Sequence, residues 1–376
     1  REAGGIPPLV RLLEQGSTAL QSDALEALTF LAENYDNSEA ICAAGALPFV
    51  IELARSGANA QRSVAALGLA RLCRSEASAQ AAREAGGVSV LARLVRSGTA
   101  EQRGHAALAL TSLAENDDDN LPAIREAGAI APLVTLVRTG DNDQKEKAAS
   151  ALAILARNAE NKVCIREADG IPPLVSLARR GTEPQKARAA AALWTLARDE
   201  TNAVAIREAG GVKALVELVG GGTDAQKEHA AGALGNLAME PGSQEAMRRE
   251  GGVSALVALA RDGTLEGRET AAAALANLAI ERQSRVAIRE SGGVPVLVGL
   301  LAERDSPSAP SDAAAALANL AGDTASQVAV RKAGGLPPLV ALLRDGSDTQ
   351  KEDAAGALWN LASGNADNQA AIIDAG

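Results

Sequence analysis

The segment GGLPPLVALLRDGSDTQKEDAAGALWNLASG, residues 334–364, contains the signals for two helices and for the bends around them. Two prolines follow a glycine pair, and proline early in a helix costs little because the first amides lack intrahelical acceptors. The apolar pattern then stops at Gly346, where a helix end favours a left-handed residue without a Cβ. The segment therefore predicts a helix over 336–345 and a second, longer helix within 350–364.

The same pattern recurs along the whole chain at a fixed period. Its landmark is EAGG and its variants, and successive landmarks are 41 or 42 residues apart. The landmark positions are Gly4, Gly45, Gly86, Gly128, Asp169, Gly210, Gly251, Gly292, Gly334 and Gly376. Nine full units cover essentially all 376 residues without a linker. This regularity predicts one solenoid domain over residues 1–376, because stacked repeats bury a continuous core.

Each unit is predicted to contain three helices, one short and two longer. A short helix such as NQAAIIDAG, residues 368–376, leads to each landmark, so the chain ends with a partial tenth unit. The eighth unit departs from the pattern, because ERDSPSAPSD, residues 303–312, replaces the capping glycine, adds one residue and carries two prolines. An irregular and exposed loop is expected there.

Composition and charge narrow the classes of function. The chain is 47% hydrophobic but only 1% aromatic, which suits thin spaces between close-packed helices filled by Ala, Leu, Val and Ile. A formal net charge of −10 argues against nucleic acid as a partner. Three cysteines without CxxC spacing fit the cytosol or nucleus. No apolar run reaches about 18 residues, so no membrane span is expected.

The unit, with GG(I/V)xPLVxLLxxG and AAxALxNLA in nine registered copies, resembles the armadillo repeat. The resemblance implies an all-α fold, a right-handed superhelix of about nine three-helix repeats whose third helices line a concave groove. HEAT repeats are the nearest alternative, but they lack the short first helix and the asparagine of this motif. A protein-protein interaction scaffold or adaptor is the function that the resemblance implies.

The third helix has one apolar face. Counted from the landmark, leucines recur at +24 and +27 and alanines at +20, +21 and +28. At about 100° per residue these positions share one side, and +26 lies roughly opposite, together with +19, +22 and +29. Only the last four repeats carry asparagine at +26, namely Asn236, Asn277, Asn319 and Asn360.

Two interpretations of these asparagines stay open. The resemblance implies that they bind the backbone of an extended peptide, and a carboxamide offers both a donor and an acceptor for that purpose. Alternatively, the amides bridge neighbouring third helices or face water. The family's import receptors place tryptophan at +22, but here Trp194 and Trp359 stand at +25. Import-receptor function is therefore less favoured. The two tryptophans either pack against the adjacent repeat or lie at the groove edge, where Trp359 is predicted to contact a peptide.

The charged positions around the ladder of asparagines change sign along the chain. The acidic residues of repeats 6 to 9 are Glu228, Glu240, Glu269, Glu281, Asp312, Asp323, Glu352 and Asp353. The basic residues of repeats 2, 4 and 5 are Arg71, Arg74, Lys147, Arg157, Arg188 and Arg198. We hypothesise that an extended, basic peptide segment lies over repeats 6 to 9; a solvated helix face is the alternative.

A further column of arginines stands three residues before most landmarks, as in IREAGG. A structural role at the end of the short helix is favoured over an anion-binding stripe.

No pattern indicates an enzyme, a metal site or a cofactor. His105 and His229 lie three repeats apart, and the glycine pairs join helices instead of following a strand. Other roles remain open: an architectural protein that self-assembles, or the substrate-recognition part of a ubiquitin ligase. Either a monomer or end-to-end self-association is possible, and a stable monomer favours peptide capture.

Overall fold

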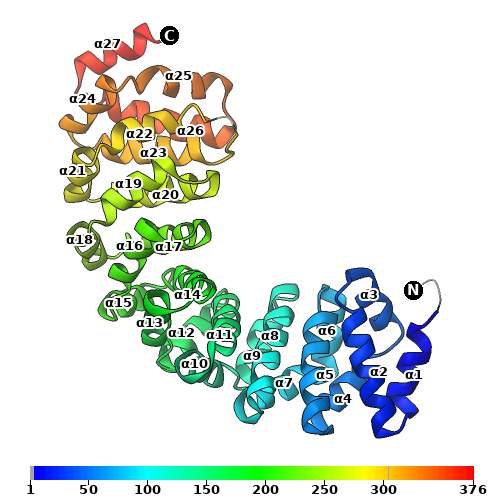
Figure 1. Ribbon diagram of the computed structural model, residues 1–376. Helices are drawn as coiled ribbons and strands as arrows, with labels where there is room; N and C mark the ends of the chain where they lie inside the picture. The colour runs from blue at the N-terminus through cyan, green and yellow to red at the C-terminus, as the bar shows by residue number, and fades with distance from the viewer. Residues whose placement is uncertain (1–3, 304) are drawn as a thin grey trace. The chain divides into compact units, whose positions relative to one another are not determined.

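The computed structural model describes residues 4–303 and 305–376, and within these residues it consists of 27 α-helices without a strand. The all-α prediction is confirmed. The chain divides into two compact units, residues 1–177 and 178–376, with the boundary inside α13 (Ile171–Arg180). Each unit is described by itself below (Figure 1).

Residues 1–177 contain twelve helices before α13 in the part that the structure describes. These are α1 (Ile6–Gln15), α2 (Thr18–Leu31), α3 (Tyr35–Ala43), α4 (Leu47–Ser56), α5 (Asn59–Leu72), α6 (Glu76–Glu84), α7 (Gly87–Ser97), α8 (Ala100–Asn116), α9 (Asn120–Glu126), α10 (Ile130–Thr139), α11 (Asn142–Leu155) and α12 (Ala159–Glu167).

Residues 178–376, without residue 304, contain the helices that follow α13. These are α14 (Glu183–Leu196), α15 (Glu200–Glu208), α16 (Gly211–Gly221), α17 (Asp224–Leu237), α18 (Pro241–Arg249), α19 (Gly252–Asp262), α20 (Leu265–Leu278), α21 (Arg282–Glu290), α22 (Gly293–Leu300), α23 (Ala309–Leu320), α24 (Thr324–Lys332), α25 (Leu336–Asp345), α26 (Asp348–Ala362) and α27 (Ala366–Asp374).

The helices recur in the predicted order of one short helix and two longer ones. In α15, α16 and α17, for example, the lengths are 9, 11 and 14 residues. Successive third helices pack side by side, α17 on α20, α20 on α23 and α23 on α26, and Figure 1 shows this unit as layers in chain order. The all-α solenoid architecture is thereby confirmed.

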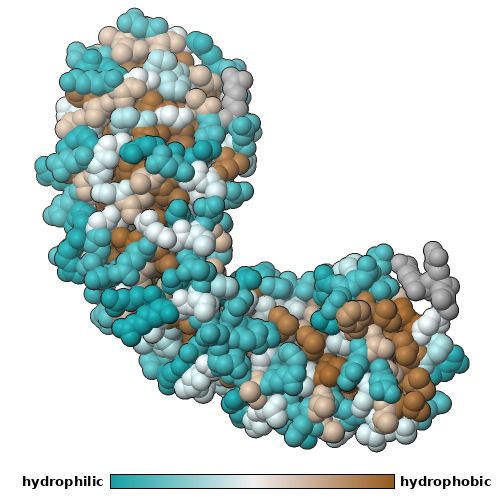
Figure 2. Space-filling model, in the orientation of Figure 1, coloured by the Kyte–Doolittle hydropathy of each residue, from teal (hydrophilic) through white to brown (hydrophobic). Residues whose placement is uncertain are grey.

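Small aliphatic side chains form the core between these layers. The +24 leucines Leu234, Leu275 and Leu317 are 0% exposed. Alanines at +21, such as Ala231 and Ala272, are equally buried and allow the third helices to approach closely. Hydrophilic side chains cover much of the face drawn in Figure 2.

The landmark residues are the points where the chain bends into the next pair of long helices. All nine landmark glycines have positive φ, which is the backbone conformation behind the expected bends; Gly210 and Gly251 both have φ 79°. Asp169 takes the tenth landmark with φ 57°, a conformation that Asp tolerates better than most residues with a Cβ.

The glycines twelve residues after the landmarks are not left-handed, and that prediction is wrong. Gly222 has φ −80° and ψ 175°, which is extended backbone. Glycine is needed there for space: a Cβ on Gly222 would lie 2.6 Å from Leu218 O and 2.9 Å from Gln226 Cβ. The close approach of the following helix, and not the sign of φ, selects the residue.

The loop of the eighth repeat is irregular, as predicted, but it is not freely exposed. Helix α22 ends at Leu300, and Ser306 in the loop is only 3% exposed. The Ser306 hydroxyl donates to Glu269 on α20 and accepts from Ala309 N at 2.7 Å. These bonds anchor the loop on the preceding repeat; residue 304 lies outside the described residues.

Candidate functional site

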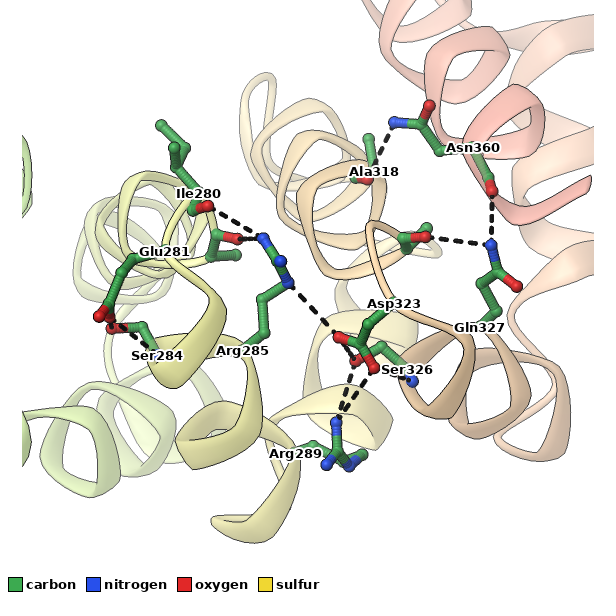
Figure 3. A network of polar contacts seen from close by, with 12 residues as sticks. Ile280, Glu281, Ser284, Arg285, Arg289, Ala318, Asp323, Ser326, Gln327 and Asn360 are labelled. Atoms are coloured by element: carbon green, nitrogen blue, oxygen red, sulfur yellow. Dashed lines mark hydrogen bonds and ion pairs between the residues drawn. The ribbon is translucent and has the colours of Figure 1, made fainter. Parts of the chain in front are cut away.

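The four predicted asparagines occupy equivalent places on four successive third helices, and all are half-buried. Each Nδ2 donates a hydrogen bond to a backbone carbonyl of the preceding third helix, always at its +25 position. The bonds are Asn236 to Trp194 O (2.9 Å), Asn277 to Gly235 O (3.0 Å), Asn319 to Ala276 O (2.9 Å) and Asn360 to Ala318 O (3.0 Å). We call this row the asparagine ladder; Figure 3 shows its last bond.

The carbonyl is available because the last carbonyls of a helix have no intrahelical partner. At the end of α17, Met239 N turns to Asn236 O (3.2 Å) and leaves Gly235 O to the Asn277 side chain. Helix α26 shows the contrast: Trp359 O, which receives no such amide, accepts from Ser363 N at 3.1 Å. Each ladder asparagine therefore caps the helix before it.

The alternative that the amides bridge neighbouring third helices is thus what the structure shows. A peptide ligand is not excluded by this bond, because Nδ2 carries a second hydrogen and Oδ1 two lone pairs. Within the described residues, no hydrogen bond reaches Oδ1 of these four side chains. Arg71 at +26 in residues 1–177 makes the same kind of bridge, donating to Thr29 O at 2.9 Å.

We expect Asn319→Ala to lower the free energy of unfolding by about 1 kcal/mol, because Ala276 O loses its donor while remaining only partly hydrated. Urea unfolding followed by circular dichroism measures this difference. Asn319→Asp also lacks the donor and places a carboxylate against Ala276 O, so it is expected to lose at least as much. Equal stability of all three proteins would show that the bridge contributes nothing.

Glu240 and Glu281 do not stand free in the groove as predicted; they cap the short helices α18 and α21. Glu240 accepts from Gly242 N and Ser243 N and pairs with Arg207 at 3.1 Å. Glu281 accepts from Ser284 N and pairs with Arg248. Burial alone would raise the pKa of Glu240, but these bonds and the nearby guanidinium hold it below its usual value. We therefore leave both acids out of the ligand contacts.

These pairs also explain the arginine column. Arginines near the end of one short helix reach an acid at the start of the next, as in Arg83 with Asp119, Arg289 with Asp323 and Arg331 with Asp367. The favoured structural role of this column is therefore confirmed.

Glu228, Glu269, Asp312 and Asp353 lie within the first two turns of successive third helices and are half-buried. Among the described residues, none of the four forms an ion pair. Hydroxyls hold two of them, Ser306 donating to Glu269 and Ser311 to Asp353. Burial, together with the charges of Glu269 and Asp353, raises the pKa of Asp312 to about 6. This end of the groove is therefore acidic, and no group of three His, Cys, Asp or Glu in the described chain could hold a metal ion.

The predicted basic stretch is partly neutralised within residues 1–177. Arg71 pairs with Glu33 at 2.7 Å, and Arg157 pairs with Asp118 at 2.9 Å. Lys147 pairs with Asp143 at 2.7 Å. The basic character is weaker than the sequence columns indicated because acids outside those columns are close in space.

The two tryptophans differ. Trp194 packs on the next third helix: a Cβ on Gly232 would lie 2.4 Å from the indole, and the His229 ring centroid is 6.0 Å away. Inter-repeat packing is confirmed for this residue. Trp359 is 76% exposed on α26, so its predicted role as a ligand contact stays a prediction.

Two hollows beside the asparagine ladder were not predicted from the sequence. Asn236, Met239, Ala197 and Ala203 line the first, of about 440 Å³, together with Arg198, Glu200 and Glu240. Ile280, Asn319, Gly322, Asn360 and Ser363 are among the residues lining the second, of about 480 Å³. Met239 is 63% exposed and Ile280 54%. Both residues stand at +29, a position that lies on the same side of the third helix as the asparagines at +26.

Side chains from the short helices fix the walls of the second hollow (Figure 3). Arg285 donates to Ala279 O at 3.1 Å and Ile280 O at 2.9 Å and pairs with Asp323 at 3.4 Å. Gln327 donates to Asn360 O at 3.0 Å and Ser363 O at 3.2 Å. These bonds supply donors to backbone carbonyls at the ends of α20 and α26, and they hold the residues that line the hollow in place.

No single helix in the described residues is long and apolar enough to cross a bilayer. One bent pair, Tyr35–Ala43 with Leu47–Ser56 at 89°, meets the length and composition criteria only when taken together.

Comparison with known proteins places these features in a family. No match is found among curated proteins. The crystal structure of an engineered protein is similar over 98% of this chain and 92% of that chain, with 34% sequence identity and a TM-score of 0.92. A second engineered protein is 35% identical over 63% of this chain and 97% of that chain, with a TM-score of 0.61.

The family model that matches is the armadillo/beta-catenin-like repeat. It matches residues 1–32, 117–157, 199–239, 241–280 and 324–363, which together exceed half of the chain. The three-helix units, the positive-φ landmarks and the third-helix leucines agree with this match. The chain belongs to the armadillo/beta-catenin-like repeat family.

Proposed function

We propose that this chain is a protein-interaction scaffold that binds an extended, basic peptide segment across α17, α20, α23 and α26. Armadillo repeats generally bind protein partners, and the family is typically non-enzymatic. The observation that carries the proposal is the asparagine ladder, which presents an unused Oδ1 on each of four neighbouring helices.

The inter-repeat bond supports the proposal by fixing each amide before a ligand arrives. A side chain that is already ordered loses less entropy on binding, so its hydrogen bond contributes more to affinity. Amides repeated once per helix hold a peptide by its backbone N–H groups and are indifferent to its side chains. The acids at the opposite end of the same helices attract a cationic segment and favour one orientation.

Peptide arrays followed by fluorescence polarisation test this function with the double variant Asn277→Ala/Asn319→Ala. We expect affinity for basic extended peptides to fall at least about tenfold, because two amide contacts are lost. The double aspartate variant loses the same inter-repeat bridges but keeps the acceptor oxygens and adds two negative charges, so it is expected to bind basic peptides more tightly than the double alanine variant does.

Asn116→Ala is the matched control. Its Nδ2 donates to Cys73 O at 3.2 Å, an inter-repeat bond in residues 1–177 away from the ladder. This variant is expected to lose stability without losing affinity. Undiminished binding by the double alanine variant would sink the proposed function.

A further inference from the structure

The proposed groove has acidic residues along one side and apolar or small residues along the other. All four third helices contribute to both sides. Each helix carries an acid near its start, a ladder asparagine near its end, and an apolar or small residue three positions later. The third residue of each set lies just past the end of its helix. The sets are Glu228, Asn236, Met239 for α17; Glu269, Asn277, Ile280 for α20; Asp312, Asn319, Gly322 for α23; and Asp353, Asn360, Ser363 for α26.

Helix geometry gives the spacing of these positions. At 1.5 Å per residue, the seven residues from Asp353 to Asn360 span about 10 Å, and the three to Ser363 about 4.5 Å. Seven residues, the spacing in α23 and α26, are close to two turns, so the acid and the amide face the same side there; in α17 and α20 the spacing is eight residues, which places the acid about 80° further around the helix. A ligand side chain that starts at the asparagine ladder must therefore be long to reach the acids, whereas a short one can enter the hollows.

Charge distinguishes the two sides. No cation among the described residues pairs with Glu269, Asp312 or Asp353, and their mutual repulsion is one cause of the raised pKa of Asp312. At the hollow, by contrast, Asp323 neutralises Arg285 at 3.4 Å. Ile280, which is 54% exposed, is the large apolar residue of this hollow, and polar side chains such as Asn319 and Gln327 also line it.

An extended peptide bound along the ladder presents its side chains alternately to these two sides. Successive side chains of an extended chain point in opposite directions, and each residue advances about 3.3 Å. Packed helices are about 8–10 Å apart, so two to three peptide residues correspond to each repeat.

We propose that the ligand of this groove alternates basic residues with compact apolar residues, the basic ones reaching the acids and the apolar ones entering the hollows beside Met239 and Ile280. This inference rests on the proposed function and adds the side-chain pattern of the peptide. Long lysine or arginine stems match the longer distance, and valine or leucine matches the shorter one.

The probes are three labelled peptides: an alternating (Lys-Val)4 peptide, a (Lys-Ser)4 peptide, and a block isomer with four lysines followed by four valines. We expect (Lys-Val)4 to bind about tenfold more tightly than either of the others, because only it places apolar side chains toward the hollows while keeping the charges on the acids. Fluorescence polarisation at 0.15 M salt measures the three affinities.

Two variants identify the hollow as the source of the preference. Ile280→Ser removes the exposed apolar wall, and Ser363→Phe fills the second hollow from its rim. Each is expected to reduce the affinity for (Lys-Val)4 several-fold and leave (Lys-Ser)4 unchanged. Leu343→Ser, which removes an exposed leucine of α25 outside the hollow, is the control and is expected to change neither affinity.

The outcomes separate this inference from the proposed function. Equal, ladder-dependent binding of (Lys-Val)4 and (Lys-Ser)4 would overturn the alternating pattern and leave groove binding standing. Tight binding of the block isomer would also overturn it. Failure of every peptide to bind would overturn both.

Discussion

Gly222→Ala is expected to lower the free energy of unfolding of residues 178–376 by about 2–3 kcal/mol, the cost typical of overpacking a closed site. The added Cβ would lie 2.6 Å from Leu218 O, a backbone atom of α16. It would also lie 2.7 Å from Gln226 Oε1, and Gln226 is 0% exposed. Withdrawal of Leu218 O would break the bond from Gly222 N that ends α16, and withdrawal of Gln226 Oε1 would break the bond from Thr223 N that starts α17.

Gly220→Ala, two residues earlier, is the matched control and should act in the opposite direction. Gly220 lies in the last turn of α16, and an added Cβ would meet nothing within 4 Å. Alanine there is expected to stabilise the unit by about 0.5–1 kcal/mol because it restricts the unfolded chain. Urea unfolding compares the two; a Gly222→Ala protein as stable as Gly220→Ala would refute the steric explanation.

Asp312→Asn is expected to stabilise residues 178–376 at pH 7.5 and to have little effect at pH 4. The pKa of Asp312 is raised from its ordinary 3.8 to about 6, so the folded state binds this proton more tightly than the unfolded state does. The protonated carboxyl therefore contributes stability that is complete below about pH 4 and lost as pH rises through 6. Asparagine is neutral throughout and avoids that loss.

The size of this effect follows from the shift. A fully buried group would give about 3 kcal/mol, and partial hydration of the half-buried carboxyl reduces this to about 1.5–2 kcal/mol. Thermal and urea unfolding at pH 4, 5, 6 and 7.5 measure it. Asp262→Asn, an exposed acid at the end of α19, should change stability by less than about 0.5 kcal/mol. A difference that did not grow between pH 4 and 6 would contradict the assignment to Asp312.

The same cluster links stability to binding. The ionised carboxylates of Glu269, Asp312 and Asp353 repel one another, and a cationic ligand would relieve that repulsion. The groove is therefore less stable empty at neutral pH than its packing alone allows. Functional sites often retain such a cost because the ligand offsets it.

Several features of the chain followed from the sequence because they are local or periodic. The period of 41 or 42 residues predicted the three-helix unit, and the glycine pairs predicted the bends, where Gly210 and its equivalents have positive φ. The leucines at +24 predicted the buried face of the third helix. In each case the type of a residue indicates its own backbone conformation or its own burial, so no knowledge of its partners in space is needed.

The tertiary structure decided what the polar residues do. Asn277 donates to Gly235 O, and nothing in the sequence marks that backbone carbonyl as its partner. Glu240 is a cap paired with Arg207, a residue 33 positions earlier that only stacking brings close. The hollow beside Ile280 is lined by Gly322 and Ser363, which follow the ends of α23 and α26 and come together only through stacking. A periodic sequence determines which face is buried, whereas the partner of a polar group depends on which backbone and side-chain atoms the stacking of repeats brings within hydrogen-bonding distance.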